Sequence, residues 1–135
     1  MTEKIRIGSE KKSWDEYIKR TTNRPPKKWL VLALPFVDKK DEALELGSGA
    51  FNDVKFLLSE GFLHITAVDI ANKVAQKIYK KLSFQKDKVE YIISSFEDFN
   101  FPKNTFDLVS AQFSLPFISP SSFDRVFDSV KKSLK

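Results

Sequence analysis

The chain has 135 residues, of which 41% are hydrophobic and 30% are charged, a balance typical of one globular domain. It has no Cys and a single His, His64, so disulfide frameworks and thiolate metal sites are excluded and a Ser-His-Asp hydrolase is very hard to build. The sequence shows neither a secretory signal nor an apolar run near the roughly 18 residues that span a bilayer, so we expect a cytoplasmic protein without a membrane partner or a metal.

The net charge of +5 is distributed unevenly along the chain. Residues 1–40 hold eleven Lys or Arg and five Asp or Glu, whereas residues 41–135 hold twelve and thirteen. The basic segment is compatible with an anionic substrate or with nucleic acid. A solvated helix followed by a Lys-rich linker is the simpler interpretation and the one we favour.

A short amphipathic helix is predicted from Glu10 to Arg20, because Trp14, Tyr17 and Ile18 recur at helical spacing. The stretch "TTNRPPKK" interrupts it, since residues that precede Pro avoid the helical conformation.

A second helix is predicted to begin at Pro26, where the missing N–H is tolerated, with its apolar face from Trp29 to Val37. Residues 1–40 are therefore expected to form a basic, helical cap that precedes the main domain. A polar turn, "DKKD", ends this cap.

The rest of the chain alternates between two kinds of pattern. Strands are predicted at Glu42–Leu46, Phe62–Val68, Val89–Ile93 and Phe106–Phe113, and helices at Asn52–Glu60, Ala71–Leu82 and Ser121–Leu134. Strands separated by helices indicate βαβ units with a parallel sheet, and right-handed crossovers place helices on both faces. The predicted fold class is therefore α/β.

The last helix is expected to begin at an N-cap provided by Ser121 or Ser122. Its predicted buried stripe consists of Phe123, Val126, Phe127 and Val130.

A glycine-rich turn follows the first predicted strand. Gly47 and Gly49 lack a Cβ, so the backbone can approach a ligand closely there. Asp69 ends the next strand, 22 residues after Gly47, at the same sheet edge. A carboxylate at this place can accept hydrogen bonds from two ribose hydroxyls, so the pattern indicates a nucleoside-containing cofactor.

Three residues distinguish between cofactor types. A dinucleotide site needs a third Gly at position 52, which is Asn52, and its pyrophosphate needs a helix N-terminus free of negative charge. Asp53 lies in that first turn and Glu45 lies two residues before the first Gly. Both disfavour an anion and favour a cationic ligand, for example a sulfonium that carries an α-amino group.

"LELGSG" and "AVDI" resemble the first two motifs of the class I S-adenosylmethionine-dependent methyltransferases, and "YIISSFEDFNFPKNTFDLVSAQFSLPF" resembles the later ones. The resemblance covers about residues 42–117 and implies a Rossmann-like sheet with the strand order 3-2-1-4 and S-adenosyl-L-methionine as cofactor. It also implies roles for individual residues: Glu45, Gly47, Ser48 and Gly49 line the methionine and ribose, Asp69 holds the ribose hydroxyls, Ile70, Ser95 and Phe96 contact the adenine, and Ala111 and Gln112 lie near the methyl group.

Two positions depart from the family pattern. Phe51 stands where the family has its third Gly, and Ser95 stands where it has an Asp. If the bulky Phe51 ring filled the rim of the sheet, the cofactor assignment would fail.

The family's sheet has seven strands, whereas four are predicted here, so we expect residues 41–135 to form an incomplete, truncated domain. An apolar fourth strand at the edge favours self-association. Three functions stay open: methyl transfer to a small molecule, which we favour; a cofactor-binding but catalytically incomplete fragment; and a nucleic-acid methyltransferase that uses the basic segment. No catalytic residue is predicted, because methyl transfer needs alignment more than a general base.

Overall fold

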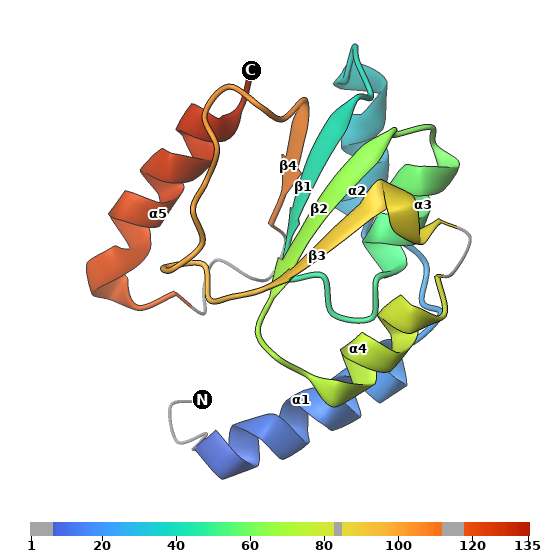
Figure 1. Cartoon of the computed structure of the whole chain (residues 1–135), viewed down its shortest axis with the longest axis vertical. Coiled ribbons are helices and arrows are strands. Elements are labelled where there is room, and N and C mark those ends of the chain that lie inside the picture. Colours follow the sequence, from blue (N-terminus) through green and yellow to red (C-terminus); the bar gives the residue numbers. More distant parts are fainter. Residues whose placement is uncertain (1–6, 83–84, 112–117) are drawn as a thin grey trace.

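The computed structural model describes residues 7–82, 85–111 and 118–135, with the side chains of residues 7–13 excepted. Its centre is a parallel sheet with the strand order β3-β2-β1-β4, as the family resemblance implies (Figure 1). The strands are β1 (Glu42–Leu46), β2 (His64–Asp69), β3 (Val89–Ile93) and β4 (Leu108–Ser110). β1 and β3 have the predicted bounds.

The other two strands differ from their predictions at their ends. Phe62 lies outside β2 because its N–H donates to the carbonyl oxygen of Leu57 and closes the preceding helix. β4 begins at Leu108, two residues later than predicted, and Phe106 instead forms an isolated parallel bridge with Leu134. Part of the predicted end of this strand falls in residues 112–117, outside the described residues.

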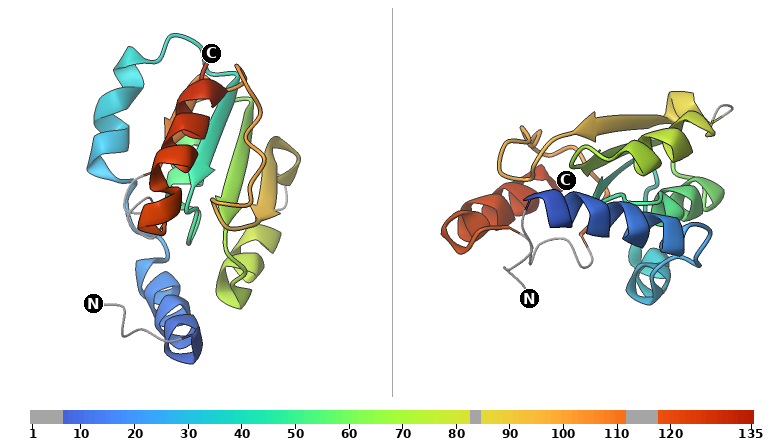
Figure 2. Two further views of the ribbon diagram at one scale, coloured as in Figure 1. Left: turned by 90° about the vertical axis from the view of Figure 1, so that its left-hand side faces the viewer. Right: turned by 90° about the horizontal axis from the view of Figure 1, so that it is seen from below.

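Helices cover both faces of the sheet (Figures 1 and 2). The helices are α1 (Ile7–Thr21), α2 (Lys28–Ala33), α3 (Asn52–Ser59), α4 (Lys73–Lys80) and α5 (Pro120–Ser133), with short 3-10 turns at Leu34–Phe36 and Lys86–Lys88. None of the helices in the described part of the chain has the length and apolarity to cross a bilayer.

The alternation of side chains along β1 divides the core into two clusters. Ala43 packs with residues of α2, α3 and α4, whereas Leu44 and Leu46 pack with Val126 and Val130 of α5. Each face of the sheet therefore has its own apolar core, and the carboxyl ends of the strands remain available for a site.

α1 lies below the carboxyl ends of the strands, beside α4 (Figure 1; Figure 2, right). Its residue Ile18 is buried in the core on the α3 and α4 side, and Asp15 accepts a hydrogen bond of 2.8 Å from the side chain of Asn72. The first helix thus closes one side of the region where a site is expected.

The prediction for α2 is wrong in its start and in its buried face. The helix begins at Lys28 instead of Pro26, and within it and the 3-10 turn that follows only Leu30 and Leu34 are buried. Trp29 and Phe36 are 66% and 85% exposed. The helix is short and contacts the core along one narrow stripe, so most of the predicted apolar face stays in solvent.

α5 also differs from its prediction. It begins at Pro120 after Ser119, whose side chain makes no capping hydrogen bond, so neither predicted Ser is the N-cap. Val126 and Val130 are buried as predicted, but Phe123 and Phe127 are 36% and 43% exposed. The two rings stack on each other with centroids 5.9 Å apart, which shields them partly from water.

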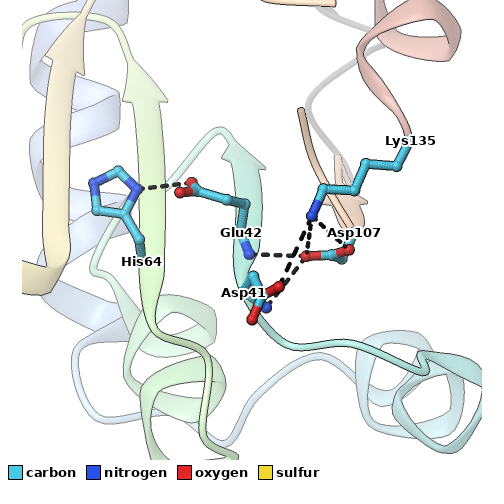
Figure 3. A network of polar contacts seen from close by, with 5 residues as sticks. All are labelled: Asp41, Glu42, His64, Asp107 and Lys135. Atoms are coloured by element: carbon cyan, nitrogen blue, oxygen red, sulfur yellow. Dashed lines mark hydrogen bonds and ion pairs between the residues drawn. The ribbon is translucent and has the colours of Figure 1, made fainter. Parts of the chain in front are cut away.

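A polar network fastens the amino ends of the strands (Figure 3). Asp107 accepts hydrogen bonds from the backbone N–H groups of Asp41, at 3.2 Å, and Glu42, at 2.9 Å, and pairs with Lys135 at 3.1 Å. Glu42 also lies 2.8 Å from Nδ1 of His64. This end of the sheet is therefore held by charged side chains, and His64 is a structural residue there.

Candidate cofactor-binding site

A pocket of about 810 Å³ lies at the carboxyl ends of the strands. Its walls come from four places: the turn after β1, the end of β2, the loop after β3 and the N-terminal segment. The lining residues include Gly47, Ser48, Gly49, Asn52, Asp53, Asp69, Ile70, Ser95 and Phe96 of the main domain. The N-terminal segment contributes Trp14, Tyr17, Arg24 and Lys27.

The turn after β1 has a backbone that glycine favours. Gly47 and Gly49 have positive φ angles of 84° and 49°. A Cβ on Gly49 would meet no atom within 4 Å, so open space lies beside it. The turn therefore exposes bare backbone to the pocket, as the sequence predicts.

Asp69 is fixed beside this turn by two backbone groups. Its Oδ2 accepts a hydrogen bond of 2.8 Å from the N–H of Gly49, and its Oδ1 accepts one of 2.8 Å from the N–H of Ile70. Burial raises the pKa of Asp69, and these two hydrogen bonds oppose the rise. Each oxygen keeps a further lone pair, which two vicinal hydroxyls can use.

The alternative in which Asp69 merely caps the next helix is wrong. The N-cap of α4 is Asn72, whose Oδ1 accepts a hydrogen bond of 3.0 Å from the N–H of Ala75. The Asp69 carboxylate does not cap α4, and it lines the pocket, where a ligand can contact it.

Glu45 lies behind the pocket wall instead of in it. The residue is 2% exposed, and its Oε1 has no hydrogen-bond partner in the described part of the structure. Burial and the nearby negative charge of Asp53 raise the pKa of Glu45 well above its ordinary value, although Lys27 and the Ser110 hydroxyl act in the opposite direction. Burial therefore favours the neutral form of the Glu45 carboxyl group beside the pocket.

Asp53 joins the N-terminal segment to the start of α3. Its Oδ1 accepts a hydrogen bond of 2.9 Å from the N–H of Lys27, and its Oδ2 lies 3.2 Å from Nζ of the same residue. The side chain of Asn52 donates to the carbonyl oxygen of Thr21 at 2.7 Å. These two contacts could not be predicted from the sequence. Lys27 and Asp53 are 26 positions apart, and Thr21 and Asn52 are 31 positions apart, so no local pattern indicates that they meet.

Phe51 does not fill the rim of the sheet. It is fully buried, and its ring meets Tyr91 edge-on with centroids 5.0 Å apart and Tyr79 at 5.9 Å. Its φ of 64° lies in the left-handed region, which favours Gly. An aromatic cluster between α4 and β3 thus holds the ring away from the pocket.

The remaining predicted residues divide into two groups. Ser95, Phe96 and Ile70 line the pocket, and the Ser95 hydroxyl accepts a hydrogen bond of 3.1 Å from the N–H of Asp98. Ala111 is half-buried and outside the pocket lining, so its predicted place near the reacting group is not seen. Gln112 lies outside the described residues.

These residues fit an adenosine-containing cation. A firmly held carboxylate is ready for ribose hydroxyls, and bare backbone gives room. Ser48 lines the pocket, and its buried hydroxyl has no hydrogen-bond partner among the described residues. Acidic side chains gather at one wall, which suits a positive charge and opposes a pyrophosphate.

Several solved structures are similar to this chain. The chain resembles a protein of Galdieria sulphuraria assigned as a sarcosine dimethylglycine methyltransferase (TM-score 0.71, 17% identity, 93% of this chain, 56% of that chain). It also resembles one of Methanococcus maripaludis assigned as an S-adenosyl-L-methionine-dependent methyltransferase (0.70, 17%, 93% and 59%).

A third similar structure is the Haemonchus contortus phosphoethanolamine N-methyltransferase 2, solved with phosphomonomethylethanolamine and S-adenosylhomocysteine (TM-score 0.70, 21% identity, 97% of this chain, 32% of that chain). The chain therefore spans about half the length of the first two structures and a third of this one. No curated protein is significantly similar in sequence. Residues 43–135 match the methyltransferase domain family, so the chain belongs to the class I S-adenosylmethionine-dependent methyltransferases, whose cofactor is S-adenosylmethionine.

Proposed function

We propose that the chain binds S-adenosylmethionine in the pocket and supports methyl transfer to a small-molecule acceptor. The observation that carries the proposal is the pair of hydrogen bonds that fix Asp69 to Gly49 and Ile70 at the pocket wall. A carboxylate held in this way needs no rearrangement to accept hydrogen bonds from the two ribose hydroxyls. Little conformational entropy is therefore lost on binding.

The other walls are assigned from their chemistry. Ile70 and Phe96 offer apolar surface to the adenine, and the turn from Gly47 to Gly49 lies along the sugar and the methionine part. The acidic wall near Glu45 receives the positive charge. The cofactor supplies the methyl group: a lone pair of the acceptor forms a bond to the methyl carbon while the carbon–sulfur bond breaks and its electron pair stays on sulfur. The protein's part is to align the acceptor and exclude water.

An acceptor with an anionic group is favoured by Arg24. This residue lines the pocket from the N-terminal segment, together with Trp14 and Tyr17. A guanidinium binds carboxylates and phosphates well, and aromatic faces attract amines. Sarcosine and phosphomonomethylethanolamine, the acceptors named for two similar structures, both combine an amine with an anionic group.

A cofactor-binding but catalytically incomplete chain is the second candidate. Its support is that the chain spans 56% and 59% of the first two similar structures, so elements that those proteins use for their acceptors need not be present here.

Calorimetric titration with S-adenosylhomocysteine tests the binding step. We expect saturable binding by the wild type and its loss in Asp69→Ala. Asp107→Ala is a matched control, because Asp107 also accepts two backbone hydrogen bonds but lies at the opposite end of the sheet. No binding by the wild type, or equal binding by Asp69→Ala, would reject the proposal. Incorporation of labelled methyl groups into amino-carboxylate or amino-phosphate acceptors then distinguishes the two candidates.

A further inference from the structure

Glu45 occupies a place that is unusual for a carboxyl group. It lies in the central strand β1, where it pairs with Ala67 of β2 on one side and Ser110 of β4 on the other. The side chain is excluded from water, and Oε1 has no hydrogen-bond partner in the described part of the structure. Burial disfavours an ionised carboxylate whose Oε1 lacks a hydrogen-bond partner, so the pocket without a ligand favours the neutral acid.

The charges that face Glu45 come from three elements. The acidic residues Asp53 of α3 and Asp69 of β2 act to raise the pKa of Glu45, and the basic Lys27, just before α2, acts to lower it. Lys27 lies 3.2 Å from Asp53 and is already balanced by it. The Ser110 hydroxyl of β4 adds no charge. An ionised Glu45 would therefore be a third carboxylate beside Asp53 and Asp69, with one cation that already pairs with Asp53.

The same charged residues also form a wall of the pocket. Asp53, Asp69 and Lys27 line it. Gly47 and Ser48, which are two and three residues after Glu45 in the chain, line it as well. A positive charge bound at this wall would be near the carboxyl groups of Asp53, Asp69 and Glu45. Its field favours the ionised form of Glu45.

We propose that Glu45 is the proton-releasing group of this pocket: it is neutral when the pocket is empty and ionises when a cation-bearing nucleoside binds. The inference rests on the proposed function of the pocket. In the step itself the O–H bond of the carboxyl group breaks, its electron pair stays on the carboxylate, and the proton passes to the buffer. The ionised Glu45 then balances the positive end of the ligand.

Three nucleosides separate the contributions of charge and shape. S-adenosylmethionine carries a sulfonium, an ammonium and a carboxylate group, S-adenosylhomocysteine carries the ammonium and the carboxylate, and 5′-methylthioadenosine carries none of the three. We expect proton release with the first two and none with the third. Because release of a proton must accompany binding below the pKa of Glu45 in the empty pocket, the Kd for S-adenosylhomocysteine should fall with rising pH, by at most about tenfold per pH unit. The Kd for 5′-methylthioadenosine should stay level.

The experiment is calorimetric titration of the full chain in phosphate and in Tris at the same pH. These buffers differ in ionisation enthalpy, so the difference between the two binding heats counts the protons released. Glu45→Gln keeps the shape of the neutral acid and cannot release a proton. Glu42→Gln is the matched control: it is the same substitution in the same strand, at the opposite end of the sheet beside His64. We expect proton release in the wild type and in Glu42→Gln, and none in Glu45→Gln.

The outcomes distinguish this inference from the proposed function. Binding of S-adenosylhomocysteine with equal heats in both buffers overturns the inference while the pocket remains a cofactor site. Proton release that persists in Glu45→Gln also overturns it, because another group must then supply the proton. Absence of binding by every nucleoside rejects the proposed function itself. If Glu45→Gln did not fold, the wild-type comparison of S-adenosylhomocysteine with 5′-methylthioadenosine would decide, since equal proton release by both contradicts a charge-driven ionisation.

Discussion

The carboxylate of Asp69 and the backbone N–H of Gly49 are joined by a hydrogen bond of 2.8 Å that links the end of β2 to the turn after β1. Neighbouring parallel strands bring their carboxyl ends to one edge, so a residue 20 positions away becomes the partner of the glycine turn. The bond sets the turn and the carboxylate in place before a ligand arrives. Binding then has less conformational freedom to remove.

Asp69→Asn keeps one acceptor oxygen and replaces the other with an amide N–H₂, which cannot accept from Gly49 or from a ribose hydroxyl. A hydrogen bond to a charged group contributes roughly 1.5–3 kcal/mol. We therefore expect the Kd for S-adenosylhomocysteine to rise by about tenfold or more in calorimetric titration. Asp107→Asn should leave the Kd unchanged, and a similar loss of affinity in both variants would show that the effect is on folding.

Phe51 gives a test of backbone strain. Removal of its buried ring should destabilise the protein by about 3–5 kcal/mol. At its φ of 64°, however, Gly is favoured over Ala by about 1–2 kcal/mol. We expect Phe51→Gly to be more stable than Phe51→Ala in urea unfolding, the reverse of the usual order in a helix.

Phe56, inside α3, is the matched control for this comparison. There Phe56→Ala should be more stable than Phe56→Gly by about 1 kcal/mol. If the same order held at position 51, the left-handed conformation of Phe51 would be contradicted.

β1, β3 and the glycine turn with Asp69 could be predicted because each depends on local pattern, whereas the strand order was predicted only from the family resemblance. The run of apolar residues marks a buried parallel strand, and Gly47 and Gly49 mark a turn whatever follows. The contact between Asp53 and Lys27 could not be predicted in the same way. It joins segments that are distant in sequence, and its residues are ordinary surface types until the fold brings them together.

Phe51 shows a second limit. The sequence did not decide whether its ring fills the rim of the sheet; in the structure the ring packs in the core against the rings of Tyr79 and Tyr91. The burial of α5 could be predicted only in part. The periodicity of apolar residues identified one apolar side of the helix, but the sheet covers only the part of that side around Val126 and Val130. Which flank of an amphipathic helix is covered depends on how its axis lies, and the sequence pattern does not record this.

The side chains of α5 are unequally buried, so we expect truncation of the smaller Val126 to destabilise the protein more than truncation of the larger Phe123. Val126 is 1% exposed, whereas Phe123 is 36% exposed and has the neighbouring ring of Phe127 as its aromatic partner. We expect Val126→Ala to lower the free energy of unfolding by about 2 kcal/mol, because a cavity remains in the core. Phe123→Ala should lower it by less than about 1 kcal/mol. Urea unfolding checks both values, and a larger loss from Phe123→Ala would mean that the face of α5 assigned as buried is wrong.

The raised pKa of Glu45 predicts how the stability of the empty protein depends on pH. A group whose pKa is higher in the folded state contributes its full stability below its unfolded value, here 4.5, and this contribution is lost as the pH rises through the folded value. Glu45→Gln keeps a neutral side chain at every pH. We expect it to match the wild type near pH 4 and to have a higher Tm, by several degrees, above the folded pKa.

Thermal unfolding of both proteins across this pH range is the measurement. Glu42→Gln, at the far end of β1, should not show this gain with rising pH. A wild type that keeps its full stability as the pH rises would contradict a neutral Glu45. Glu45→Gln, which should gain stability above the folded pKa of Glu45, should also lose the pH dependence of cofactor binding, because the same carboxyl group governs both effects.

Asp107 predicts the opposite dependence on pH at the other end of the sheet. Burial acts to raise its pKa, but hydrogen bonds from Glu42 and Asp41 and the contact with Lys135 outweigh this and lower the pKa below the ordinary 3.8. Its contribution to stability is therefore present above pH 3.8 and lost as the pH falls through the folded value. Asp107→Asn should be less stable than the wild type by about 1 kcal/mol near pH 7, and the difference should shrink in acid. Urea unfolding at pH 7 and pH 3 checks this, and a difference that grows in acid would contradict it.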